Sequence, residues 1–353
     1  MWFVTRREDI IAVLRDAATF RTDSAHSTIR DTFGVQMLSA EGDIHRRYKS
    51  QCNAPFNAKS VAEHATPLVR DKVRELLDRA AGHRELELRS AVASELAVYM
   101  AATVLGVPQA LHGAIRHWYD AFAASLANFR WDAEVRARGH AAVGAFHGAV
   151  LPLIREYERS PNASLLGTLS RITSDRLTDE EILSNSLIVL FGGIETTEST
   201  MLNVIWSLLR HPDVLARVRR ERSLLPRAIE EAIRWEPAVQ SCTRHVARPV
   251  IFRGASIAEG DSVQCMIGAA NRDPSHFADP DVYDIDRPNC GDHLSFGSGR
   301  HFCLGAALAR AETVVLMESL LDRYPTLRFD DERPAAPYGY EFRAPRELNV
   351  VVA

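Results

Sequence analysis

No long apolar run occurs in this chain of 353 residues, which argues against a segment that crosses a membrane. The most apolar stretch, 187–194, is far too short to span a bilayer. Basic residues stand at the N-terminus, but no apolar region follows them, so neither a signal peptide nor a membrane anchor is expected. We therefore expect a soluble protein of the cytoplasm with no membrane partner.

Cysteine is also scarce, and its arrangement argues against two further classes of protein. The five cysteines are odd in number and scattered, which does not fit a disulfide framework. No pair has the C-x-x-C spacing, so a structural zinc site is not expected. Charge is nearly balanced, with 42 Lys and Arg against 46 Asp and Glu. The formal net charge of −4 gives no reason to expect a nucleic-acid partner.

Apolar residues at helical spacing fill most of the first two-thirds of the chain. This pattern predicts helices at 9–20, 61–81, 91–105, 109–126 and 132–157. Thr178 and Glu181 form a capping-box pattern, in which each side chain satisfies a backbone N–H of the other residue. The helix that they open is expected to run to about Arg210, before His211 and Pro212.

From residue 238 the pattern changes to short β-type runs separated by glycines, with an irregular segment at 271–292. The elements expected here are strands at 250–252, 262–265 and 348–352 and a helix at 306–324. No repeat and no interdomain linker is visible. We predict one mainly α domain with small β-sheets over 1–353, helix-rich at 1–237 and β-containing at 238–353.

One cysteine differs from the other four in its surroundings. Gly297 and Gly299 precede Cys303 and permit backbone angles that other residues resist, so the chain can turn tightly beneath a flat ligand. The helix expected from Ala306 would present N–H groups and a positive end to the sulfur, which favours thiolate over thiol. A thiolate is a known axial ligand of haem iron. Structural roles are expected for the remaining cysteines, Cys52, Cys242, Cys265 and Cys290.

Two glycines interrupt the long predicted helix, and an acid and two hydroxyls follow them in Gly192-Gly193-Ile194-Glu195-Thr196-Thr197. Each glycine in mid-helix costs about 1 kcal/mol relative to alanine, so the pair requires a reason. Either the absent side chains let a flat cofactor or small ligand approach the backbone, or the helix packs closely on a neighbour. The hydroxyl of Thr196 could bond back to a carbonyl or turn toward such a ligand. The residues alone leave both explanations open.

Several segments together resemble the cytochrome P450 family. The segment 296–305 matches its cysteine-ligand loop, F-x-x-G-x-x-x-C-x-G, at every fixed position. The segment 192–197 is similar to its oxygen-activating motif, (A/G)-G-x-(D/E)-T-T. Glu231 and Arg234 match its E-x-x-R, and Arg287 falls where the family supplies a third partner. The resemblance covers nearly the whole chain and is typical of the soluble bacterial class.

The resemblance implies the single-domain cytochrome P450 fold, with an N-terminus shorter than usual, and a haem b cofactor whose iron is bound by Cys303. It also implies that Thr196 and Glu195 are catalytic, with Glu195 feeding protons inward, and that the three E-x-x-R partners are structural. The implied cofactor-binding residues are His45, Lys49, Gly192, Arg244, Phe296, Gly297, His301, Cys303, Leu304 and Gly305. Lys49 departs from the family's arginine, because lysine keeps the charge but loses the planar fork.

The implied activity is that of a monooxygenase, which uses O2 to hydroxylate, epoxidise or oxidatively couple a small organic substrate. Electrons would come from NAD(P)H through a ferredoxin or flavodoxin type donor, which Arg46, Arg47, Arg300 and Arg310 would attract. The substrate pocket would be lined by 27–38, 119–129, Leu190, Gly193, 239–241 and 340–342. The aromatic residues of 128–131 favour an apolar or aromatic substrate of the secondary-metabolite type.

Three alternatives remain at this point. A peroxygenase would keep Cys303 but use peroxide, although the acid–alcohol pair at 195–196 favours O2 in this family. A haem-binding protein without turnover is supported only by the short N-terminus, where a missing edge strand would leave 2–6 less protected. A cysteine hydrolase has the least support, because no Cys–His arrangement is visible in the sequence.

Overall fold

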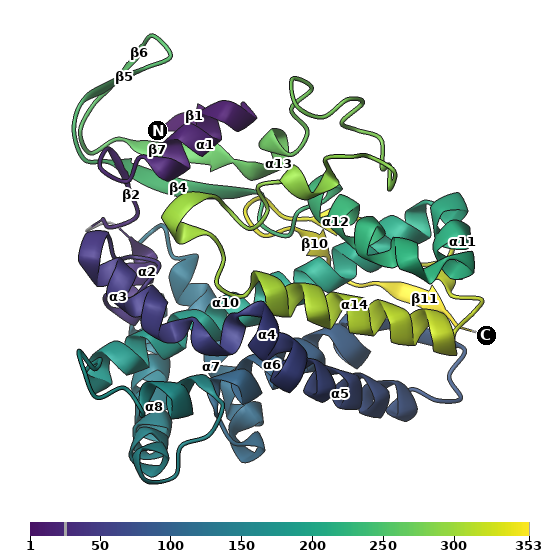
Figure 1. The fold of residues 1–353 in the computed structure, drawn as a ribbon, viewed down its shortest axis with the longest axis horizontal. Helices are drawn as coiled ribbons and strands as arrows, with labels where there is room; N and C mark the ends of the chain where they lie inside the picture. The colour runs from purple at the N-terminus through teal and green to yellow at the C-terminus, as the bar shows by residue number, and fades with distance from the viewer. Residues whose placement is uncertain (25–26, 353) are drawn as a thin grey trace. The chain divides into compact units, whose positions relative to one another are not determined.

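Helices supply most of the structure, and short strands form small sheets among them (Figure 1). The computed structural model describes residues 1–24 and 27–352. Contacts divide the chain into two compact units, each built from several segments. The first unit comprises Met1–Phe20, Thr66–Leu96 and Glu195–Ala353, and the second comprises Arg21–Ala65 and Ala97–Ile194.

The main sheet of the first unit carries the core that supports the cysteine segment. Its strands follow the order β1 (Trp2–Val4), β7 (Ser262–Met266), β4 (Ser241–Val246) and β2 (Phe20–Arg21). β1 pairs with β7 in parallel, and β7 pairs with β4 antiparallel. Its apolar core includes Val4, Ile10, Leu14, Val263 and Leu294. Because Leu294 lies shortly before Cys303 in the chain, the start of the cysteine segment is anchored in this core.

Helices and three smaller sheets complete the first unit. The helices are α1 (Arg7–Arg15), α5 (Thr66–Arg79), α11 (Pro212–Arg220), α12 (Leu225–Trp235), α13 (Ile267–Ala270) and α14 (Ala306–Arg323). In the three-stranded sheet, β11 (Asn349–Val351) lies between β3 (Glu85–Glu87) and β8 (Arg328–Phe329). The two other sheets pair β5 (Val250–Phe252) with β6 (Ala255–Ile257), and β9 (Pro337–Tyr338) with β10 (Ala344–Pro345). α14 packs on α5 and on α12, which places the helix after Cys303 beside the E-x-x-R helix.

The second unit is helical and has an aromatic core. Its helices are α2 (Thr28–Phe33), α3 (Gly42–Cys52), α4 (Ala58–Ser60), α7 (His112–Leu126), α8 (Ala133–Arg159) and α9 (Leu165–Leu169). The rings of Phe33 and Phe122 meet edge to face, with centroids 5.4 Å apart. Phe122 also meets Phe146 of α8 at 6.4 Å. α6 (Ser94–Leu105) and α10 (Asp179–Arg210) each begin in one unit and end in the other.

Short helical turns connect these elements. The 3-10 turns are Ala54–Phe56, Gln109–Leu111, Arg222–Leu224, Cys290–Asp292 and Gly299–His301, and the π-helical turns are Val61–Ala65 and Arg89–Ala93. Across residues 1–24 and 27–352, no helix combines the length and the apolar character that a membrane crossing demands.

Local sequence patterns predicted most of these elements. The capping box before α10 is confirmed: the Thr178 N–H donates to the Glu181 carboxylate at 2.8 Å, and the Glu181 N–H donates to the Thr178 hydroxyl at 3.2 Å. The helix predicted at 9–20 ends earlier, at Arg15. The Asp16 carboxylate accepts the N–H groups of residues 18 and 19, so an Asx-type turn replaces the last helical turn. β3 was missed, because its pairing partner β11 lies far along the chain.

Candidate active site

The segment before Cys303 forms a tight loop whose backbone requires glycine. Gly297 and Gly299 have φ of 77° and 73°, in the left-handed region that side chains other than glycine rarely adopt. The N–H of Cys303 donates to the carbonyl of Phe296 at 2.8 Å and closes the loop. Cys303 is exposed, whereas Cys52, Cys265 and Cys290 are buried and Cys242 is half-buried. The loop therefore presents one accessible sulfur.

The helix after the loop begins where the sequence predicted. α14 starts at Ala306, and its N-cap residue Gly305 accepts the N–H of Ala309 at 2.9 Å. Only Leu304 and Gly305 separate Cys303 from this helix. The N-terminal end of α14 therefore follows the cysteine closely in the chain, and the thiolate expected there stays a prediction.

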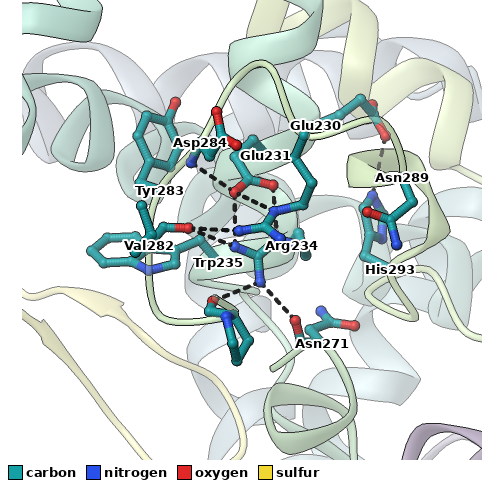
Figure 2. Close-up of polar contacts among 12 residues, drawn as sticks. Glu230, Glu231, Arg234, Trp235, Asn271, Val282, Tyr283, Asp284, Asn289 and His293 are labelled. Atoms are coloured by element: carbon teal, nitrogen blue, oxygen red, sulfur yellow. Dashed lines mark hydrogen bonds and ion pairs between the residues drawn. The ribbon is translucent and has the colours of Figure 1, made fainter. Parts of the chain in front are cut away.

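A buried ion-pair network surrounds Glu231 and Arg234 (Figure 2). Arg234 donates two hydrogen bonds to the Glu231 carboxylate, each at 2.7 Å, and both side chains are fully buried. Arg287 adds a third contact to Glu231 at 3.1 Å. Arg234 also donates to the backbone carbonyls of Asn271, Pro280 and Val282. This geometry is that of a structural support, as the resemblance implied for these three residues.

Asn271 connects this network to the cysteine loop. Its carbonyl accepts from Arg234 at 2.8 Å, while its side-chain oxygen accepts the N–H of Leu294 at 2.7 Å. Its side-chain amide donates to the Ser295 hydroxyl at 2.8 Å, and that hydroxyl donates to the carbonyl of Ile233. The entry to the loop is therefore bonded to both α12 and the segment after α13. The sequence pattern did not indicate this role, because the partners are distant in the chain.

Arg244 is a buried cation that lacks an anionic partner within the described part of the chain. Its residue is 7% exposed, and its guanidinium donates to the carbonyl of Thr243 at 2.9 Å. No described carboxylate lies within ion-pair distance of it. The pKa of the Cys242 thiol is lowered by its hydrogen bond with Cys265 and also by the Arg244 guanidinium, which interacts with this thiol. A contact of Arg244 with a cofactor carboxylate stays a prediction.

The other predicted propionate contacts fall in different units. His45 and Lys49 lie one turn apart on α3 of the second unit, with His45 buried and Lys49 half-buried. His301 ends the 3-10 turn before Cys303 and is half-buried in the first unit, which also holds Arg244. Their joint role at one cofactor stays a prediction.

The two glycines of α10 have different surroundings. A Cβ on Gly193 would lie 3.2 Å from the Cβ of Ala101, so this glycine permits close packing on α6. A Cβ on Gly192 would meet no described atom within 4 Å. Close packing thus accounts for one glycine, and open space at the other suits the approach of a ligand. Further along the same helix, the Thr196 carbonyl accepts the hydroxyl of Thr200 at 2.7 Å.

Glu195 lines a small polar cavity within the first unit. The cavity has a volume of about 190 Å³ and is lined by Arg89, Glu195, Ser199, Tyr338, Phe342, Ala344 and Arg346. Arg89 donates to the carbonyl of Pro345 at 2.8 Å and forms an ion pair with Glu198. The Arg346 guanidinium lies over the Tyr338 ring at 4.0 Å. Polar groups thus surround the carboxylate that the resemblance assigned to proton delivery.

Some residues expected at the substrate pocket have other surroundings. Phe33 and Phe122 are 2% and 0% exposed and form part of the core of the second unit. Phe129 is 71% exposed, and Trp131, with φ of 56°, is 40% exposed. The aromatic character of 128–131 is therefore a surface feature of this unit.

The four arginines expected to attract an electron donor also differ from one another. Arg47 donates to Asp175 and Glu181 at 2.9 and 2.7 Å, and Arg310 donates to both oxygens of Glu230. These two guanidinium groups make internal ion pairs, and their part in a docking surface stays a prediction. Arg46 and Arg300 are exposed, and Arg46 bonds only to a neighbouring exposed carboxylate among the described residues.

Known proteins resemble this chain over nearly its full length. A family model described as cytochrome P450 matches residues 129–338. The biotin biosynthesis cytochrome P450 of Bacillus subtilis is 32% identical, over 99% of this chain and 89% of that protein. The C-19 steroid 1alpha-hydroxylase of Sorangium cellulosum is 34% identical, over 96% and 86%. The solved structure of P450BioI, in complex with acyl carrier protein ligated to hexadec-9Z-enoic acid, superposes with a TM-score of 0.90 at 31% identity, covering 99% of this chain and 91% of that one.

Proposed function

This chain belongs to the cytochrome P450 family, and on that premise we propose that it is a haem monooxygenase using O2 to hydroxylate, epoxidise or oxidatively couple a small organic molecule. The observation that carries this proposal is the loop of Cys303, with its exposed sulfur ahead of α14. We assign the iron to this sulfur.

The residues present fit a haem. Cys303 supplies the thiolate, and the buried guanidinium of Arg244 lacks a described carboxylate, as a partner of a propionate would. Open space at Gly192 suits a flat ring against α10. We assign the remaining cofactor contacts to His45, Lys49, Phe296, Gly297, His301, Leu304 and Gly305.

When bound, the haem supplies an iron centre for O2 chemistry, which a thiolate ligand favours by donating electron density. The chain's own residues hold that group and move protons. Glu195 faces a polar cavity, so its carboxylate would exchange protons with solvent there and pass them along α10. The hydroxyl of Thr196, the next residue, would orient the proton donor on the side opposite Cys303.

An apolar substrate is supported by the relatives, since one is named as a steroid hydroxylase and another binds a fatty acyl group in its solved structure. We propose that electrons reach the site from NAD(P)H through an acidic ferredoxin or a flavodoxin, attracted by exposed arginines such as Arg46 and Arg300. This activity fits an enzyme of the cytoplasm. A peroxide-driven reaction remains the second candidate, and a haem protein without turnover the third.

A comparison of Thr196→Ala, Thr196→Ser and Cys303→Ser tests the function. The Cys303 variant should lose the red-shifted Soret band that the parent shows when reduced with carbon monoxide. Thr196→Ala should keep this band and consume NAD(P)H, but release peroxide in place of product, while Thr196→Ser recovers part of the yield. An unchanged ratio of product to NAD(P)H in Thr196→Ala would contradict the catalytic role. Product formed with peroxide but not with O2 and reductant would favour the peroxygenase.

A further inference from the structure

Glu230, which precedes the E-x-x-R glutamate, has a separate set of partners. Arg310 of α14 donates to its two oxygens at 2.5 and 2.9 Å, and His293 donates to it at 3.1 Å (Figure 2 shows the contact with His293). Burial alone would raise the pKa of Glu230, but the hydrogen bonds from Arg310 and His293 lower it to about 2. The carboxylate is therefore ionised at neutral pH and holds both partners.

His293 is held in one tautomer. Its Nδ1 accepts the N–H of Ser295 at 3.2 Å, so the ring proton lies on Nε2 and is donated to Glu230. The side chain is 2% exposed. Its ring also lies against the ring of Phe296, with centroids 5.6 Å apart. The histidine thus connects the carboxylate to the cysteine loop.

Arg310 reaches the loop more directly. Its guanidinium lies over the ring of Phe296, 4.4 Å from the centroid. The carbonyl of the same phenylalanine accepts the N–H of Cys303 at 2.8 Å. A guanidinium can bind a carboxylate through its edge and stack on a ring through its face, whereas lysine cannot do both. The ring of Phe296 therefore contacts both a planar cation and the ring of His293, while its backbone carbonyl is bonded to Cys303.

We propose that Arg310, oriented by Glu230 and His293, is a positioning residue that holds Phe296 and thereby the geometry of the Cys303 sulfur. The inference rests on the proposed function, in which that sulfur binds the haem iron. Groups around an axial ligand tune the reduction potential of the metal and the strength of its bond. Arg310 accordingly acts on the iron through Phe296 and touches neither cofactor nor substrate.

Haem-loaded Arg310→Met, Arg310→Lys and Glu230→Gln test this role, with Arg217→Met as the matched control. Arg217 pairs with the exposed Asp286 in the same unit, and no contact of this pair with Phe296 or Cys303 is seen among the described residues. Three readouts are compared: the haem reduction potential, the rate at which the red-shifted carbon monoxide band is lost on mild heating, and amide exchange in the peptide that contains Cys303. The last readout is repeated on protein stripped of haem.

Both Arg310 variants should shift the haem reduction potential. They should also raise the rates of carbon monoxide band loss and of amide exchange by about two- to thirtyfold, the range expected for a lost cation–π contact. Glu230→Gln should give a smaller change in the same direction, and Arg217→Met none. In a Phe296→Leu background, Arg310→Met should have no further effect on these readouts.

Full rescue by Arg310→Lys, or variants that lose thermal stability with all three readouts unchanged, would overturn the inference. If the parent itself lacks the red-shifted band, the proposed function fails instead, while amide exchange in the haem-free protein still tests the positioning of the loop.

Discussion

Glu230 and Glu231 are neighbours on α12, yet their carboxylates lie in two different polar networks (Figure 2). Consecutive helical residues point about 100° apart, so the two side chains leave the helix on different faces. Glu231 is fully buried and binds Arg234 and Arg287, whose other donors bond backbone carbonyls of the segment 271–282. Glu230 keeps 21% of its side chain exposed and binds Arg310 and His293, beside Cys303.

The difference separates two kinds of support for one loop. The Glu231 network joins α12 to the backbone of the irregular segment 271–289. No strand or helix of the described structure lies in this segment, so it lacks the regular backbone hydrogen bonds of those elements. Removing one charge there leaves a buried charge with fewer partners than it had, which is costly. The Glu230 network touches the loop through a ring, so we expect its loss to alter the site more than the fold.

Arg234→Met should have the largest effect. It would leave Glu231 without its bidentate partner at a position that is 0% exposed, at a cost of about 3–5 kcal/mol in the free energy of unfolding. Denaturant unfolding of the purified protein measures this cost, and a poor yield of folded protein would be its simplest sign. A loss similar to that of Glu230→Gln would show that the two networks do not differ as described.

Glu230→Gln should cost less, about 1.5–3 kcal/mol at neutral pH. Glutamine keeps one acceptor oxygen but loses the charge that strengthens the bonds from Arg310 and His293. The same unfolding experiment gives the value, and the variant should still bind haem. Failure of this variant to fold would place Glu230 with the structural network.

The stability that Glu230 adds should depend on pH in a stated window. Its pKa is lowered from 4.5 to about 2 on folding, so its contribution is complete above pH 4.5 and is lost as the pH falls toward 2. The unfolding free energies of the parent and of Glu230→Gln should therefore converge over this window, by up to about 3 kcal/mol. A difference that stays constant from pH 5 to the lowest measurable pH would contradict the ionised carboxylate.

Arg217→Met should have the smallest effect. Arg217 donates to Asp286 at 2.8 and 3.0 Å, but both side chains are exposed and water replaces the lost bonds. The free energy of unfolding should be unchanged within error, although the hydrogen bonds of this pair are nearly as short as those between Arg234 and Glu231. A large loss would mean that burial is not what separates the two networks from ordinary surface pairs.

Local patterns predicted the parts of the site that depend on neighbours in the chain. The capping box at Thr178, the pairing of Glu231 with Arg234, and the glycine loop before α14 all involve residues within a few positions of each other. Such contacts follow from helix geometry or from the backbone freedom of glycine. The roles of Thr196, Glu195 and the cofactor-binding residues came from family resemblance, and they remain proposals.

Contacts between distant segments could not be predicted in this way. Arg310 lies 80 positions from Glu230, and the role of Asn271 depends on a loop 23 positions away. Arg310 was expected at a docking surface because its charge is visible in the sequence, whereas its partner is not. The sequence also could not tell which of the two glycines of α10 is needed for close packing, because Ala101, the neighbour of Gly193, is distant in the chain.

The sequence by itself therefore determined the longest helices and the glycine-dependent loop before Cys303, because those features depend on residues adjacent in the chain. Only the tertiary structure decided which charges are buried and which partner each one has. A charge's free energy depends on the solvent it loses and the groups that replace it, and packing alone brings those groups together.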